Sequence, residues 1–347
     1  MVRVAAILAG LLALTALAYA PVLSAPFAYE DRSWVFSAPA TWQKPAGRAE
    51  WIPGRALTTW TIGATAQAVG YDARVFHAQN LAIHLANGVL VYGMASAIVS
   101  PPAGIVAAAV FLWLPLNSQA VSYVSARADL LVTFFTLAAI WLAMGSAWWR
   151  WPLVVVALLG AALSKEIGLI AVPIVIWTVV CLRPSWRDGA ALGCLVGVAS
   201  LLMWQSRAVM ELWRQAPDVG WSAFLSHELV AVWYLLSLTV RPDLLSIDHD
   251  YLALGPVWRV SSIVLTWWAV IVACAAWPVW PRVTWTIGVV ALSVGPRFLF
   301  PNSEYIHERH LYLGTAAISL CVGWLGVAAW QRWCSPSAPA LTRGAFV

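Results

Sequence analysis

Apolar runs recur along most of the chain and are separated by short polar segments. The first run covers residues 4–23. Ten further runs centre on residues 78–98, 103–116, 128–147, 151–163, 167–182, 189–204, 224–240, 258–279, 283–300 and 311–330. An apolar helix of about 20 residues spans a bilayer, and a helix satisfies its own backbone hydrogen bonds in lipid. The pattern therefore predicts an all-α polytopic membrane protein, a bundle of about 10–11 transmembrane helices.

The composition agrees with this class of protein. Hydrophobic residues make up 62% of the 347 residues and charged residues only 10%, which is too little polar surface for a soluble domain. Many of the 24 tryptophans lie at the ends of the runs, as in an aromatic belt at a membrane interface. The net charge of +5 comes from arginines scattered over short loops. This pattern argues against nucleic acid as a partner and for membrane lipid.

The placement of charge predicts the orientation of the chain. Arg3 precedes the first run, so the positive-inside rule puts the N-terminus in the cytoplasm and makes residues 24–74 the first external loop. A cleaved signal peptide is the alternative, but the run is longer than a signal's apolar core of about 7–15 residues. The loop charges favour about ten crossings, with residues 224–240 re-entrant or lying on the surface. We expect one membrane domain over residues 1–333 and a disordered tail over 334–347.

Polar groups inside or beside membrane spans are costly, so they are the first candidates for function. Glu30, Asp31 and Arg32 follow the first apolar run directly. Taken alone, this triplet is also explained as a solvated loop with a local pair between Arg32 and an acid. Its position at the end of the first span is what makes it a candidate.

A second polar group lies along one helical face. His77, Asn80, His84 and Asn87 are spaced by three, four and three residues, which puts all of them on the same side of a helix. Such a stripe is also typical of hydrogen bonding between helices in a membrane bundle. His77 and His84 are two turns apart, so a shared metal ion would need a ligand from another element. The sequence thus leaves a divalent metal open without indicating one, and it implies no cofactor.

Three later motifs add ionisable residues. They are "NSQAVSYVSARADLL" with Arg127 and Asp129, "LSKEIG" with Lys165 and Glu166, and "SEYIHERHLYL" with Glu308, Arg309 and His310. The first two are also explained as a helix start and a turn, each with a local charge pair. With about ten crossings, the motifs lie on the outer face together with Asp31. One acid among several cations suits a base that faces an anionic group such as a lipid phosphate.

The order of these motifs resembles a known family. The stretches are "YEDR", "RALTTWT" with "GYDARVFHAQNLAIHLANGVLVY", "LPLNSQAVSYVSARADLL", "LSKEIG", "WYLLSLTVRPDLLSIDHDY" and "ERHLYL". They are similar to the membrane part of the tetratricopeptide-bearing transmembrane O-mannosyltransferases and their bacterial relatives. That family belongs to the GT-C superfamily, whose members use polyprenyl-phosphate sugars. The resemblance covers roughly residues 1–330.

The resemblance implies a GT-C-like bundle with functional external loops, in a bacterial inner membrane, with an active site facing the periplasm or exterior. It implies transfer of a sugar from a polyprenyl-phosphate donor to a hydroxyl of a protein Ser/Thr or a glycan. By position, Asp31 is the catalytic base, while Arg127, Lys165 and Arg309 bind the donor phosphate. The residues expected to line or support the site are Glu30, His77, Asn80, His84, Asp129, Glu166 and His310.

Two other classes of function stay open. A membrane transporter or lipid flippase also carries charges in its spans, but it is expected to show a polar path to both faces and often internal repeats. A non-catalytic family member acting as a partner subunit is the other. Residues 114–119 read "LPLNSQ", where the family has a His and a Glu, and the loss of these two ionisable groups keeps that alternative open.

Overall fold

A computed structural model describes residues 2–31, 55–145, 147–182, 220–246, 249, 256–276, 281–299 and 307–334. Every regular element in these ranges is helical, so the prediction of an all-α chain is confirmed for them. The α-helices are α1 (Val2–Ala18), α4 (Ala56–Val69), α5 (Ala73–Ile98), α6 (Pro101–Trp113), α7 (Ser118–Ser122), α8 (Arg127–Ala143), α9 (Arg150–Ser164), α10 (Ala171–Leu182), α13 (Trp221–Leu238), α14 (Pro256–Ala276), α15 (Pro281–Val294), α16 (Pro296–Leu299) and α17 (Tyr312–Cys334). Short 3₁₀ helices are η1 (Ala20–Ser24), η2 (Pro115–Asn117), η3 (Glu166–Ile170), η4 (Pro242–Leu244) and η6 (Glu308–Leu311).

Two helical segments in the described ranges are long and apolar enough to cross a membrane. They are Ala73–Ile98 and Glu308–Trp333. A third candidate is Pro101–Trp113 together with Pro115–Ser122, which are bent by 55° relative to each other. The expected total of about 10–11 transmembrane helices stays a prediction, and the apolar run at residues 189–204 lies outside the described ranges.

The bend after α6 has a local cause. Leu114 precedes Pro115, and the residue before a proline is pushed away from helical geometry. Leu114 accordingly has extended backbone angles, with ψ of 117°, and ends α6. The chain then turns through η2 and α7 into residues 123–126. This connection carries backbone groups to one end of the bundle, where the candidate residues lie.

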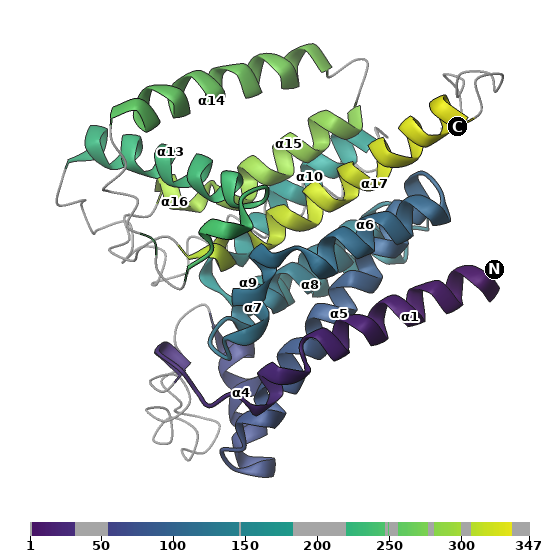
Figure 1. Cartoon of the computed structure of the whole chain (residues 1–347), viewed down its shortest axis with the longest axis vertical. Coiled ribbons are helices and arrows are strands. Elements are labelled where there is room, and N and C mark those ends of the chain that lie inside the picture. The colour runs from purple at the N-terminus through teal and green to yellow at the C-terminus, as the bar shows by residue number, and fades with distance from the viewer. Residues whose placement is uncertain are drawn as a thin grey trace.

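The centre of the bundle is built from α5, α6, α8 and α17, with α9, α10 and α15 around them (Figure 1). Small residues let these helices approach closely. A Cβ on Gly323 of α17 would lie 2.6 Å from the carbonyl oxygen of Ala103 in α6. In Figure 1, α1 and α4 lie at one side of the bundle and α13 and α14 at the other. Much of the surface is apolar, and Trp267, Trp268 and Ile271 of α14 are all exposed.

The bundle has two distinct ends (Figure 1). The start of α1 and the finish of α17 lie at one end. The finish of α1, the short helix α7 and the start of α17 lie at the other. Residues far apart in the sequence thus lie at the same end of the bundle.

The structure adds detail at two places in the sequence-based domain boundaries, and the external placement of the first loop stays a prediction. Residues 24–74 are expected to be an external loop, but they contain the helix α4. Its sequence, "ALTTWTIGATAQAV", mixes threonine with small residues and gives no long apolar run. The expected tail begins at residue 334, whereas α17 runs through Cys334; residues 335–347 lie outside the described ranges.

Candidate functional site

Asp31 lies seven residues after η1 and is only 1% exposed. The backbone N–H of Ser125 donates to its Oδ1 at 2.8 Å, and the N–H of Ala28 makes a long contact of 3.5 Å with its Oδ2. Among the described residues, no cation lies within ion-pair distance of this carboxylate. Tyr29 has a φ of +46°, a strained conformation for an aromatic residue. Arg32 lies outside the described ranges.

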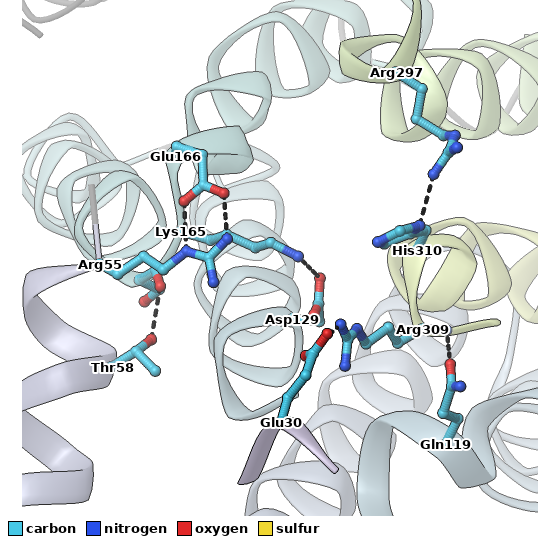
Figure 2. A network of polar contacts seen from close by, with 11 residues as sticks. Glu30, Arg55, Thr58, Gln119, Asp129, Lys165, Glu166, Arg297, Arg309 and His310 are labelled. Atoms are coloured by element: carbon cyan, nitrogen blue, oxygen red, sulfur yellow. Dashed lines mark hydrogen bonds and ion pairs between the residues drawn. The ribbon is translucent and has the colours of Figure 1, made fainter. Parts of the chain in front are cut away.

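Glu30, the neighbour of Asp31, binds Arg309. Arg309 donates from Nη2 to Glu30 Oε2 at 2.9 Å, and its backbone N–H donates to Gln119 Oε1 at 3.0 Å. Figure 2 shows these contacts bringing the first segment, α7 and η6 together. Two of the residues predicted from the sequence, 279 positions apart, are thus in direct contact.

Lys165 and Asp129 form a second ion pair beside the first (Figure 2). Lys165 Nζ lies 2.8 Å from Asp129 Oδ1, and the two side chains are 9% and 7% exposed. Asp129 sits in the first turn of α8, where the helix dipole favours a negative charge. The structure therefore brings Glu30, Asp129, Lys165 and Arg309 to one place.

Glu166 does not pair with Lys165, as it would if the motif were only a turn with a local charge pair. It binds Arg55 instead, with Arg55 Nε donating to Oε2 at 2.6 Å and Nη2 donating to Oε1. Lys165 has extended backbone angles, φ −157° and ψ 149°, so successive side chains point to opposite sides. Thr58 Oγ1 also donates to the carbonyl of Ser164 at 2.6 Å. Helix α4, absent from the sequence-based prediction, is thereby anchored beside the site.

Arg127 and Asp129 do not form the local charge pair of the alternative explanation either. Arg127 is 1% exposed and turns toward α5. Its Nε donates to Asn80 Oδ1 at 3.0 Å, its Nη2 donates to the Phe76 carbonyl at 3.2 Å, and its guanidinium lies 5.5 Å from the centre of the Phe76 ring. These contacts join α8 to α5, and a role of Arg127 at a donor phosphate stays a prediction.

The polar stripe on α5 bonds to neighbouring helices. Asn80 Nδ2 donates to the Tyr123 carbonyl at 2.6 Å, and His84 Nε2 donates to the Leu112 carbonyl at 3.3 Å. The hydroxyl of Tyr312 in α17 donates to His84 Nδ1 at 2.7 Å. His77 Nε2 donates to the Ala25 carbonyl at 3.2 Å, so His77 holds the segment that carries Asp31.

The stripe thus divides into two parts. His77 and Asn80 contact the segments around Asp31, whereas the partners of His84 lie in the core between α5, α6 and α17. Among the described residues, no three His, Cys, Asp or Glu side chains are placed to hold a metal ion.

His310 and Glu308 connect η6 to α13 and α16 and to two further residues, Ser246 and His249. Arg297 of α16 donates from Nη1 to His310 Nδ1 at 2.7 Å and from Nε to Glu228 Oε2 at 2.7 Å. Glu308 Oε1 accepts from the Ser246 N–H at 2.8 Å and from His249 Nε2 at 3.1 Å. The sequence analysis did not select Arg297 or Glu228 as candidate residues, although each is a charged residue within an apolar run.

Tyr123 lies in the connection between α7 and α8, and its ring centre is 6.2 Å from that of Tyr29. Partial burial raises the pKa of its hydroxyl, and the negative charge of Asp31 adds to this. The phenol therefore keeps its proton at neutral pH and remains a hydrogen-bond donor at the edge of the site.

A comparison with protein-family models, curated proteins and solved structures finds no match. Function is therefore argued from the arrangement of the residues themselves. A buried carboxylate with spare accepting capacity lies beside two ion pairs whose cations, Lys165 and Arg309, are suited to an anionic group. That combination can take up a proton and stabilise a developing negative charge.

Proposed function

We propose that the protein is an integral membrane glycosyltransferase of the GT-C type. It transfers a sugar from a polyprenyl-phosphate donor to a hydroxyl of a protein Ser/Thr or a glycan, on the outer face of a bacterial inner membrane. One observation carries the proposal. The ion pairs Glu30–Arg309 and Lys165–Asp129 lie beside each other (Figure 2) and Asp31 follows Glu30 directly, so these groups come together from four separate segments of the chain.

Asp31 acts as the general base. The Ser125 N–H fixes one carboxylate oxygen, and the remaining lone pairs accept the proton of the acceptor hydroxyl. The acceptor oxygen attacks the anomeric carbon as the bond from that carbon to the phosphate oxygen breaks. The proton stays on Asp31 and the electron pair leaves with the polyprenyl phosphate, so the anomeric configuration is inverted.

Arg309 and Lys165 stabilise the departing phosphate. Each is paired with a carboxylate, Glu30 or Asp129, and a phosphate group can share or replace that partner through charge-assisted bonds. Arg127 contributes positive charge from inside the bundle, because its Nε and Nη2 already bond to α5. Glu166, His77 and His310 support the segments that carry these groups.

Exposed apolar side chains support the placement of the protein in a membrane, and the positions of its arginines support the proposed orientation. Large apolar side chains are exposed on several helices, and two or three helical segments are candidate spans. Arg150 starts α9 and Arg332 lies in the last turn of α17, at the ends opposite Lys165 and Arg309. The positive-inside rule then places the end of the bundle that carries Asp31, Lys165 and Arg309 outside the cytoplasm.

The test is Asp31→Asn. Membranes containing the full chain are incubated with polyprenyl-phosphate hexoses that carry a radiolabelled hexose, and the label transferred to protein and glycan is counted. We expect transfer to fall about 10²- to 10⁴-fold, the usual contribution of a general base. Asp243→Asn, at an exposed carboxylate, is the matched control and should transfer as well as the wild type.

Retention of full transfer by Asp31→Asn at normal protein level would rule out this assignment. Movement of the donor across a reconstituted bilayer by the wild type, without any transfer, would favour a flippase instead.

A further inference from the structure

Three buried polar atoms around Asp31 have no hydrogen-bond partner among the described residues. They are His77 Nδ1, Ser125 Oγ and Arg127 Nη1. The three residues are 2%, 8% and 1% exposed. A buried polar atom without a partner lowers stability, and native structures keep few of them. Three such atoms near one carboxylate therefore need an explanation.

The contacts of Ser125 and His77 place them close to Asp31. The backbone N–H of Ser125 donates to the Asp31 carboxylate, so the hydroxyl of Ser125 belongs to a residue that is in direct contact with that carboxylate. His77 bonds through Nε2 to Ala25, six residues before Asp31 in the same segment. The charge of Asp31 also acts on His77.

Arg127 belongs to the same neighbourhood. Its Nε bonds to Asn80, which lies one turn from His77 on α5. The charges of Asp31 and Arg127 act on each other, and Arg127 also acts on His77. The four groups thus lie between α5, the residues around Asp31, and the connection from α7 to α8.

The hydrogen-bonding capacities of these groups are complementary to one oxygen atom. His77 Nε2 donates to the Ala25 carbonyl, and the Ser122 carbonyl also faces the ring. With the proton on Nε2, the other ring nitrogen, Nδ1, is an acceptor. The carboxylate of Asp31 is a second acceptor. Arg127 Nη1 and the hydroxyl of Ser125 are donors. Two acceptors and two donors match the two protons and two lone pairs of a water molecule, and buried waters characteristically satisfy such groups.

We propose that Asp31, His77, Ser125 and Arg127 form a binding site for one oxygen that both donates and accepts hydrogen bonds. In the resting protein the occupant is a water molecule. During transfer the acceptor hydroxyl displaces that water, a role that rests on the proposed function. The hydroxyl then donates its proton to Asp31 and accepts from Arg127 and Ser125, and only the bond to His77 is lost.

The resting occupant is tested by an experimental structure of the full wild-type chain in lipid nanodiscs, at a resolution that shows ordered water. We expect one solvent peak within about 2.6–3.2 Å of at least three of the four groups. A region without such a peak, in which the three atoms bond to protein groups instead, would overturn the site. This measurement does not depend on any activity.

The acceptor role is tested by Ser125→Ala, which removes Oγ and keeps the backbone N–H that binds Asp31. With a radiolabelled polyprenyl-phosphate hexose at saturation, a Ser/Thr peptide and a methyl hexoside serve as acceptor probes. We expect the acceptor KM to rise about threefold to tenfold, the size of one lost hydrogen bond, while the donor KM stays unchanged. Ser125→Thr keeps a hydroxyl and should restore the acceptor KM.

The controls separate this proposal from the proposed function. Ser24→Ala removes an exposed hydroxyl that bonds only locally to Pro21 and should change neither KM. If the wild type transfers sugar and Asp31→Asn does not, but Ser125→Ala has a wild-type acceptor KM, the acceptor role is wrong. If the wild type transfers nothing while the solvent peak is present, the proposed function is wrong and the water site is supported.

Discussion

Asp31 and Glu308 are both carboxylates almost entirely removed from solvent, at 1% and 3% exposure, but their surroundings differ. Glu308 accepts two hydrogen bonds on Oε1, from the Ser246 N–H at 2.8 Å and from His249 Nε2 at 3.1 Å. Asp31 accepts one short bond from the Ser125 N–H and one long contact. Glu308 thus has a backbone N–H and an imidazole on one oxygen, whereas three buried polar atoms around Asp31 have no partner among the described residues.

The difference in surroundings suggests different roles for the two carboxylates: a structural one for Glu308 and a chemical one for Asp31. Burying a carboxylate is unfavourable unless hydrogen bonds or an opposite charge compensate it. Glu308 meets that condition and joins Ser246 and His249 to the start of α17. Asp31 meets it only in part, so packing alone does not account for a carboxylate there. A polar group kept at a cost to stability is most easily explained by a role in chemistry.

The largest effect on stability is expected for Glu308→Ala. The variant leaves the Ser246 N–H and His249 Nε2 without this acceptor, and a buried polar group left unsatisfied costs about 1–3 kcal/mol. We expect a loss of about 2–4 kcal/mol in the free energy of unfolding, measured by denaturant titration in detergent. Glu308→Gln keeps one acceptor oxygen and should lose less than half as much.

Asp31→Asn is the matching variant at the other buried carboxylate, and we expect it to change stability much less than Glu308→Ala does. Its amide oxygen still accepts from Ser125, so the free energy of unfolding should stay within about 1 kcal/mol of the wild type. If Asp31→Asn and Glu308→Ala lost equal amounts of stability, the contrast between the two carboxylates would be wrong and Asp31 would be a structural residue.

Arg309→Gln tests the residue that lies between the two regions in η6. It removes the charged partner of Glu30 and, on the proposed function, a ligand of the donor phosphate. We expect the donor KM to rise about tenfold to a hundredfold, since a charged hydrogen bond contributes about 1.5–3 kcal/mol. Arg309→Lys keeps the charge and should recover part of the loss; an unchanged donor KM in Arg309→Gln would remove Arg309 from the site.

The smallest effect is expected at an exposed carboxylate, Asp243. The hydrogen bond from Arg241 lowers the pKa of Asp243, so any stability from this pair exists at neutral pH and is lost as the pH falls through that lowered pKa. The side chains are 56% and 60% exposed, and water and salt screen such pairs. Asp243→Asn should therefore melt and transfer like the wild type at pH 7 and melt like it at pH 4. A clear drop in the melting temperature of Asp243→Asn at pH 7 would show that an ion pair can stabilise this protein even where both side chains are exposed.

The helices were largely predictable, because each long apolar run needs a helix and the runs are bounded by proline and polar residues. The predicted run at 78–98 lies inside α5, and the run at 128–147 overlaps α8. Helix α4 was not predictable in this way, because its mixed composition gives no run. Its place is fixed by contacts with a distant element, the ion pair from Arg55 to Glu166.

The candidate site was predictable as a set of residues but not as a set of contacts. Ionisable groups beside apolar runs identified Asp31, Lys165 and Arg309, because the cost of such groups makes each one noticeable. Ser125 and Arg297 gave weaker signals, because a serine in a polar motif and an arginine near a helix end are both common.

The sequence by itself determined which residues share a helical face, since the helical period fixes the common side of His77, Asn80, His84 and Asn87. Only the tertiary structure decided the partners. Lys165 binds Asp129 across 36 positions, Glu166 binds Arg55 across 111, and Arg309 binds Glu30 across 279. Local geometry relates residues within a turn or two of helix, whereas ion pairs between helices depend on how the whole bundle packs.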